Sequence, residues 1–207
     1  MPEDDFVHSR LTHSLEVASV GRSLAREVGK IILSKNKALK VSGIKYQDFG
    51  DVVSAACLAH DLGNPPFGHS GEQSISFFFL NTKEGQFFES MVKPAEWSDL
   101  INFEGNAQGF RILTNPNHGG LSLTYSTLAT FTKYPLSSSS KKNHPRQSQH
   151  KYGFFYNDLT YFNTIAEELQ LTKTAEGNWL RHPLAFLVEA ADDICYSIID
   201  LEDATRL

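Results

Sequence analysis

Residues 57–72, CLAHDLGNPPFGHSGE, bring several groups capable of metal and proton chemistry together. The stretch begins as an apolar helix and then places His60 directly beside Asp61. Adjacent helical residues point about 100° apart, so one ion contacts both only if it lies over the gap between them. An imidazole nitrogen and a carboxylate oxygen suit Mn²⁺, Mg²⁺, Fe or Zn²⁺. The pair therefore predicts part of a metal site, and His69 and Glu72 follow shortly after it.

Further ligand candidates lie near the two ends of the chain. His13 shares a helical face with Val17 and Val20, which predicts that it points towards the core. A core histidine bonded to a backbone carbonyl is the alternative interpretation. Asp192 and Asp193 lie among apolar residues of a late helix, and periodicity leaves open which of them faces a site.

The elements that must position these groups are helical. Apolar residues recur at helical spacing from 11 to 35. Similar patterns predict helices at 51–61, 103–113, 121–133, 158–171 and 184–204. Residues 80–101 are typical of a short helix or an ordered connection, and strand-like alternation is nowhere sustained. The sequence predicts an all-α fold.

Composition limits the class of protein. A length of 207 residues fits one domain, and 41% hydrophobic with 21% charged residues is typical of a soluble globular chain. There is no apolar stretch of bilayer-spanning length and no signal-peptide pattern at the start, so we expect no membrane partner. Cys57 and Cys195 are too few for a disulfide framework. They predict reduced core cysteines in a cytoplasmic protein.

Two stretches have alternative interpretations. The net charge of −5 argues against broad nucleic-acid binding, although Lys141, Lys142, Arg146 and Lys151 form a local basic cluster. That cluster lies in 136–151, which has no periodicity and is predicted to be a flexible surface loop rather than a polyanion site. The run Phe77-Phe78-Phe79 is interpreted as a buried core face, with an interface as the alternative.

Five motifs taken together carry a resemblance to a known family. They are RLTHSLEV, AHDLGNPPFGHSGE, FEGNAQGFRIL, LTYSTLATFTKYP and HPLAFLVEAADDICYSIID. In this order they resemble the HD-domain deoxynucleoside triphosphate triphosphohydrolases, the dGTPase family, over nearly the whole chain. The resemblance implies a single HD domain over 1–207, a helical bundle around a mononuclear metal site. We expect this domain to be one lobe of a longer protein truncated at both ends, because the last helix lacks a stop signal.

The resemblance also implies the activity. Four ligands, His13, His60, Asp61 and Asp192, would hold one divalent metal ion, which is Mn or Mg, or else Fe, Zn or Ni. The positions of Tyr196 and Asp200 favour Asp192 over Asp193. Members of the family hydrolyse a dNTP, here with dGTP favoured, to a deoxynucleoside and inorganic triphosphate by water attack at the α-phosphorus.

Roles for the other motif residues follow from the same resemblance. His69 would move a proton, and Glu72 would orient His69 or act as the base itself, although Glu72 alternatively caps a helix beginning near Ser70. Asn64 stands where some HD hydrolases have a second histidine, and an asparagine cannot shuttle a proton. The residues expected to contact substrate are Arg10, Asn64, Lys133, Tyr134, Tyr196 and Asp200, and Tyr134 is alternatively a core residue.

The implied partners are a deoxynucleoside triphosphate, further copies of the chain in a homo-oligomer, and single-stranded DNA or a nucleotide as effector. Two rival hypotheses stay open. One is an HD phosphohydrolase that acts on other nucleotides. The other is an inactive metal-binding or assembly fragment.

Overall fold

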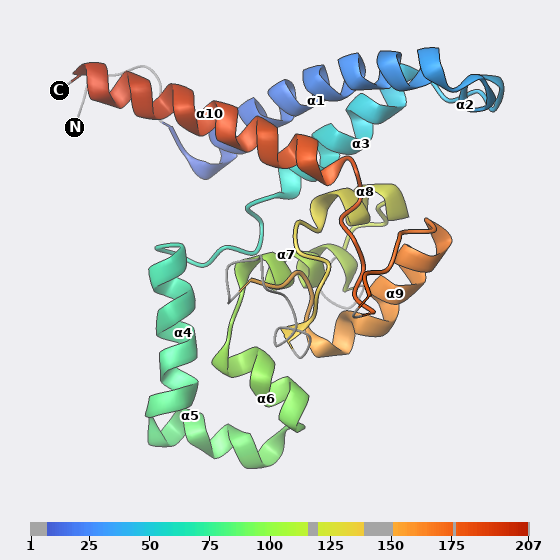
Figure 1. Ribbon diagram of the computed structural model, residues 1–207. Coiled ribbons are helices and arrows are strands. Elements are labelled where there is room, and N and C mark those ends of the chain that lie inside the picture. The colour runs from blue at the N-terminus through green and yellow to red at the C-terminus, as the bar shows by residue number, and fades with distance from the viewer. Residues whose placement is uncertain (1–7, 116–119, 139–150, 176, 207) are drawn as a thin grey trace. The chain divides into compact units, whose positions relative to one another are not determined.

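Helices dominate the computed structural model, which describes residues 8–115, 120–138, 151–175 and 177–206 (Figure 1). Within these ranges, backbone pairing outside helices and turns is confined to two isolated bridges, Ser137 with Phe154 and Lys173 with Trp179. The predicted all-α fold is therefore confirmed. None of the helices in the described ranges is both long and apolar enough to cross a membrane.

The chain divides into two compact units, residues 1–60 with 183–207 and residues 61–182. The first unit contains four helices in its described part: α1 (Arg10–Lys35), α2 (Lys37–Val41), α3 (Tyr46–Ala59) and α10 (Ala185–Arg206). Helices α1, α3 and α10 pack against one another, so the start and the end of the chain share one core (Figure 1). The prediction of a single HD domain over the whole chain stays a prediction.

Small residues let these three helices approach closely. A Cβ atom at Gly21 of α1 would lie 2.6 Å from Cys57 Sγ of α3 and 3.5 Å from Ala191 Cβ of α10. Cys57 and Ala191 are both fully buried at this contact. Burial raises the pKa of the Cys57 thiol to about 12, and Asp192 and Cys195 add to the effect. The expectation of reduced core cysteines agrees with two free, buried thiols at Cys57 and Cys195.

The second unit holds the remaining helices around an aromatic core. They are α4 (His69–Asn81), α5 (Lys83–Phe87), η1 (Phe88–Met91), α6 (Pro94–Ile101), α7 (Gly105–Thr114), α8 (Tyr125–Phe131), η4 (Tyr156–Asp158) and α9 (Leu159–Glu168). Phe154 and Phe162 stack with ring centroids 4.4 Å apart, and Phe110 lies 5.8 Å from Phe162. Aromatic pairs at these distances add to the stabilisation from apolar burial.

Several predicted boundaries shift. Helix α3 begins at Tyr46, five positions before the expected start at 51, and α8 begins at Tyr125 rather than 121. The stretch 80–101, expected to be a short helix or connection, contains α5, η1 and α6. Helix α4 has little helical signal in the sequence, because its apolar residues are mostly consecutive and do not recur at helical spacing. Its earlier half is rich in Ser and Gly.

The core interpretation of Phe77 and Phe78 is wrong. Their exposed fractions are 61% and 41%, and Phe79 alone of the three makes edge contacts with Phe88 and Trp97. The physical reason is that α4 packs on α5 and α6 through only one side, so consecutive aromatic residues cannot all face inwards. The alternative, an interface, stays a prediction.

The predicted surface loop at 136–151 lies mostly outside the described residues, which exclude 139–150. At its edges, Leu136, Ser137 and Ser138 are buried, and the Ser138 hydroxyl donates to the Asp99 carboxylate. Lys151, at the other edge, forms two ion pairs and keeps only 18% of its side chain exposed. The interpretation of Lys151 as part of a solvated basic cluster is therefore wrong.

Candidate metal centre

The start of α1 fixes the position of His13. Ser9 is the N-cap, its hydroxyl accepts from the Thr12 N–H, and Thr12 Oγ1 accepts from the Ser9 N–H at 2.8 Å. This reciprocal capping box satisfies backbone donors that the first helical turn leaves unpaired. The motif Ser-Arg-Leu-Thr-His thus starts the helix so that His13 faces inwards, where it is 4% exposed.

The end of α3 fixes His60 in a similar way. His60 is the C-cap residue, and its Nδ1 lies 2.7 Å from the carbonyl oxygen of Cys57. Because a carbonyl only accepts, Nδ1 must carry the proton and donate. In the neutral ring Nε2 is then the unprotonated nitrogen, which is the form that binds metals. The polar C-terminus of α3 therefore presents the His60 imidazole in a fixed orientation.

Asp192 of α10 meets both histidines. Its Oδ1 lies 3.1 Å from His13 Nε2 and 3.6 Å from His60 Nε2. One ligand atom from each of the three residues lies within 4.8 Å of the others. Asp193 is exposed, so the structure resolves the choice that periodicity left open in favour of Asp192. Three of the four predicted ligands are brought together, and their role as ligands stays a prediction.

The donor set fits a divalent metal ion. His60 Nε2 in the neutral ring and Asp192 Oδ1 are both acceptors, and two acceptors 3.6 Å apart repel unless a cation or proton lies between them. His13 Nδ1 is also buried, without a hydrogen-bond partner among the described residues. Two imidazoles and one carboxylate suit Zn, Fe and Mn better than a purely oxygen-binding ion.

Asp61 is oriented by the turn that follows His60. Its Oδ1 accepts from the Asn64 amide at 2.7 Å, and its carbonyl accepts from the Asn64 N–H at 3.1 Å. Asn64, predicted to contact substrate, thus holds the Asp61 carboxylate in place. Asp61 belongs to the second unit, and its role as a fourth ligand stays a prediction.

Glycines bring this turn against α7. A Cβ atom at Gly63 would lie 2.0 Å from the Gly105 carbonyl oxygen and 2.1 Å from the Gly109 nitrogen. A Cβ atom at Gly105 would lie 2.4 Å from Asn64 Oδ1. Only residues without a Cβ permit this backbone approach. The glycines of FEGNAQG therefore support the turn that carries Asp61 and Asn64.

Glu72 belongs to a buried ion-pair cluster in which Lys151 pairs with both Glu72 and Glu104. Glu72 Oε1 accepts from the N–H of Gly105 at 2.8 Å, and its Oε2 lies 3.2 Å from Lys151 Nζ. Lys151 Nζ also donates to Glu104 Oε1 at 3.0 Å. Glu72 does cap a helix, but it caps α7 rather than the helix near Ser70. Lys151 and Glu104 were not predicted, because the pairing joins residues far apart in sequence.

Burial and charge act in opposite directions on this cluster. Burial raises the pKa of the Glu104 carboxyl, although its hydrogen bonds to Asn106 and Lys151 lower it. Burial alone would lower the pKa of Lys151, but the two carboxylates outweigh it and raise the pKa above its ordinary value. The lysine therefore stays charged and balances part of the negative charge buried around it.

The remaining predicted residues are more accessible. Arg10 is exposed on the first turn of α1, and Asp200 is exposed on α10. Tyr196 is 49% exposed, with its ring centroid 4.8 Å from that of His13. His69, the first residue of α4, is exposed, and the described hydrogen bonds include none between it and Glu72. A direct His69–Glu72 pair is therefore not seen.

A cationic patch surrounds Tyr134, which is half-buried rather than a core residue. Lys133 Nζ lies 5.7 Å from its ring centroid and Arg181 Cζ lies 5.3 Å from it. Cations over an aromatic face are attracted by its quadrupole. Arg181 was missed from the sequence, although it lies just before the motif HPLAFLVEAADDICYSIID.

Comparison with known proteins identifies the domain. The model of the HD domain matches residues 10–105, a range that includes His13, His60 and Asp61 and ends before Asp192. A deoxyguanosinetriphosphate triphosphohydrolase-like protein of Synechocystis sp. is 49% identical over 216 residues, covering 97% of this chain and 48% of that protein.

Other relatives extend the similarity. A protein of the same name from Pseudomonas aeruginosa (strain LESB58) is 45% identical over 208 residues, covering 99% of this chain and 46% of that protein. A protein of Yersinia enterocolitica named deoxyguanosinetriphosphate triphosphohydrolase is 35% identical over 228 residues, covering 97% of this chain and 44% of that protein. The chain spans about half the length of the curated relatives it matches.

Proposed function

We propose, since this chain is a member of the HD-domain dGTPase family, that it hydrolyses deoxynucleoside triphosphates, with dGTP favoured, to a deoxynucleoside and inorganic triphosphate. The observation that most supports this proposal is the cluster of His13, His60 and Asp192. These residues are far apart in the sequence, yet their ligand atoms lie close together. Family membership supports a phosphohydrolase, and the substrate and the bond cleaved are our proposal.

The metal site has a defined role in this proposal. His13, His60, Asp61 and Asp192 would hold one divalent ion, which when bound supplies a Lewis acid for a phosphate oxygen and lowers the pKa of water. His60 binds through Nε2 because the Cys57 carbonyl holds its Nδ1 proton. Asn64 positions Asp61 through its amide, and its contact with substrate stays a prediction. The donor set favours Mn, Fe or Zn over Mg.

Proton transfer is assigned to His69. Its exposed ring is accessible to water and to a substrate, and an imidazole can both donate and accept a proton. Glu72 has one oxygen on the Gly105 N–H and the other near Lys151, so accepting a proton would disrupt these contacts. We therefore assign Glu72 a positioning role at the junction of α4 and α7, and not the role of base.

Phosphate binding is assigned to cations. Arg10 has a planar fork of donors suited to two phosphate oxygens. Lys133, Arg181 and the hydroxyl of Tyr134 form a second group able to neutralise a triphosphate tail. Tyr196 and Asp200, on the same helix as Asp192, are assigned to the sugar or a phosphate. In a chain of net charge −5, such local groups are needed to offset repulsion of a polyanion.

The identity of the products tests the proposal. The chain is incubated with each of the four dNTPs and Mn²⁺ or Mg²⁺, and the products are separated by anion exchange. The proposal predicts inorganic triphosphate and deoxynucleoside in equal amounts. Release of pyrophosphate or phosphate alone would support another HD phosphohydrolase, and bound metal without any hydrolysis would support the inactive fragment.

Two partners remain part of the proposal. A homo-oligomer agrees with the exposed aromatic side chains of Phe77 and Phe78 on α4. Light scattering of the purified chain tests it, and a monomeric mass contradicts it. Regulation by single-stranded DNA or a nucleotide was predicted for the basic residues of 141–151, which apart from Lys151 lie outside the described residues.

A further inference from the structure

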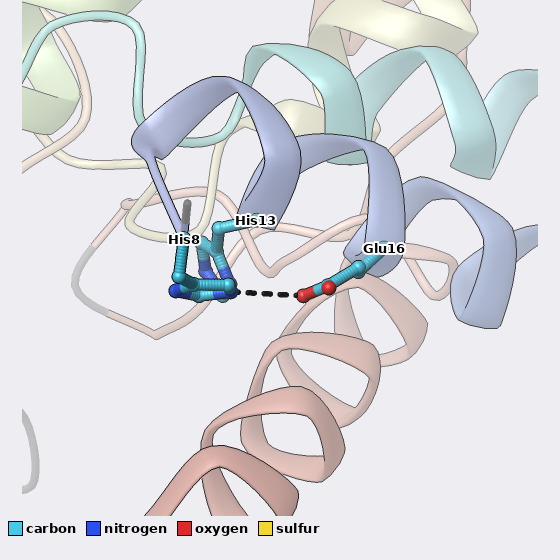
Figure 2. Close-up of side chains that lie close together, drawn as sticks. All are labelled: His8, His13 and Glu16. Atoms are coloured by element: carbon cyan, nitrogen blue, oxygen red, sulfur yellow. Dashed lines mark hydrogen bonds and ion pairs between the residues drawn. The ribbon is translucent and has the colours of Figure 1, made fainter. Parts of the chain in front are cut away.

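His13 also belongs to a second group of potential metal ligands. His8, His13 and Glu16 each offer a ligand atom within 4.8 Å of the others, and Figure 2 shows them gathered at the start of α1. His8 Nε2 lies 3.0 Å from Glu16 Oε2, and the ring centroids of His8 and His13 are 5.9 Å apart. We call this group the outer triad and the group of His13, His60 and Asp192 the inner triad.

The local structure explains why the outer triad forms. Glu16 follows His13 by three positions on α1, so the two side chains lie on neighbouring parts of one helix face. Ser9, the N-cap, has an extended backbone with φ −122° and ψ 167°. The chain at His8 therefore does not continue along the axis of α1. The capping box fixes this geometry, and the His8 side chain reaches Glu16 (Figure 2).

We propose that the outer triad is a second site for a borderline transition-metal ion such as Zn²⁺, and that its occupation withdraws His13 from the inner triad. Two histidines and one glutamate are a donor set that zinc uses in proteins, with solvent at the open position. The side chains of His8 and Glu16 are 36% and 40% exposed, so an ion from solution reaches them directly.

Sharing of His13 makes the two sites compete. An imidazole bridges two ions only as the doubly deprotonated imidazolate, so a neutral His13 ring serves one ion at a time. Zn²⁺ binds nitrogen ligands more tightly than Mn²⁺ does. Excess zinc therefore displaces the ion of the inner triad. The inhibitory consequence rests on the proposed function, whereas the second binding site does not.

Zinc binding to the metal-free full chain tests the site without any activity measurement. The variant H60Q/D192N removes two inner ligands and leaves the outer triad intact. It is expected to bind one zinc ion per chain by calorimetry, and adding H8Q and E16Q is expected to abolish this binding. The matched control E27Q changes an exposed glutamate of the same helix and should leave zinc binding unchanged. Absence of zinc from a folded H60Q/D192N variant would overturn the proposal.

A second measurement covers the case in which H60Q/D192N fails to fold. Wild-type chain and the H8Q/E16Q variant are loaded with Mn²⁺, and the release of Mn²⁺ on addition of zinc is followed by electron paramagnetic resonance. The variant should need at least about tenfold more zinc, because loss of even one second-shell partner weakens metal binding about tenfold and this variant loses two proposed ligands. Equal zinc requirements would overturn the outer site. Absence of dNTP hydrolysis by the wild-type chain, with this shift still seen, would bear only on the proposed function.

Discussion

His13 Nε2 and Asp192 Oδ1 lie 3.1 Å apart although 179 positions separate the two residues in the sequence. The pair forms because α1 and α10 pack against each other, with Gly21 of α1 and Ala191 of α10 allowing close approach. The HD-domain match ends before Asp192. The candidate metal centre therefore depends on a segment outside the matched range, which makes Asp192 the most informative residue to change.

Replacing Asp192 by Asn should remove the metal. The amide keeps the size but loses the charge, and we expect metal affinity to fall about 100-fold or more, measured by calorimetry with Mn²⁺. The control is Asp193→Asn, which changes the exposed neighbour on the same helix turn and should bind normally. Equal metal affinity in the two variants would show that Asp192 is not a ligand.

Replacing Lys151 by Met should destabilise the second unit. It leaves Glu72 and Glu104 in buried positions without their shared cation. We expect the free energy of unfolding to fall by about 3 kcal/mol, the low end for breaking a buried pair, because Lys151 keeps some exposure. Urea unfolding measures this.

The double variant Lys151→Met with Glu104→Gln separates charge from packing. It removes one of the two unbalanced carboxylates and should recover part of the lost stability. If the double variant were no more stable than Lys151→Met alone, the charge explanation would be wrong.

The same lysine predicts a dependence of stability on alkaline pH. The folded-state pKa of Lys151 is raised, so its contribution is fully present below the ordinary value of 10.5 and is lost as pH rises through the folded-state pKa. The difference in unfolding free energy between wild type and Lys151→Met should be constant at neutral pH and shrink above 10.5. A difference that stayed constant throughout would contradict the raised pKa.

Local patterns in the sequence were enough to predict the long helices. The expected helix at 11–35 corresponds to α1 and the one at 184–204 to α10, because both have a continuous apolar stripe. Burial of His13 followed from the same stripe. The exposure of Phe77 and Phe78 could not be predicted in this way. An apolar residue type alone does not say which side of a short helix other elements cover.

The candidate site was predictable where a motif carries it and not where it depends on distant pairing. His13, His60 and Asp192 were named from the residues and the resemblance, and they come together. Lys151 was assigned to a solvated loop because its neighbours in sequence are polar, while its partners Glu72 and Glu104 lie far away along the chain. Arg181 and the positioning role of Asn64 likewise depend on contacts, not composition.

Adding a methyl group at Gly21 should destabilise the first unit. Alanine is a better helix former than glycine by about 1 kcal/mol, so an open site would gain stability. Here the new Cβ would lie 2.6 Å from Cys57 Sγ, and we expect a net loss of about 1 kcal/mol or more. Thermal unfolding of Gly21→Ala checks this.

Gly21→Ala combined with Cys57→Ala serves as the matched test of the cause. Removing the sulfur relieves the clash, so the double variant should lose less than the sum of the two single changes. Simple additivity would mean that the approach of α1 to α3 is not what requires a glycine at this position.

Release of inorganic triphosphate from dGTP is the decisive measurement of the proposed activity. The purified chain is incubated with dGTP and Mn²⁺, beside the Asp192→Asn and Asp193→Asn variants, and products are separated by anion exchange. We expect triphosphate and deoxyguanosine in equal amounts from the wild type and from Asp193→Asn, and neither product from Asp192→Asn. Pyrophosphate or phosphate as the product, or unchanged triphosphate release by Asp192→Asn, would contradict this expectation.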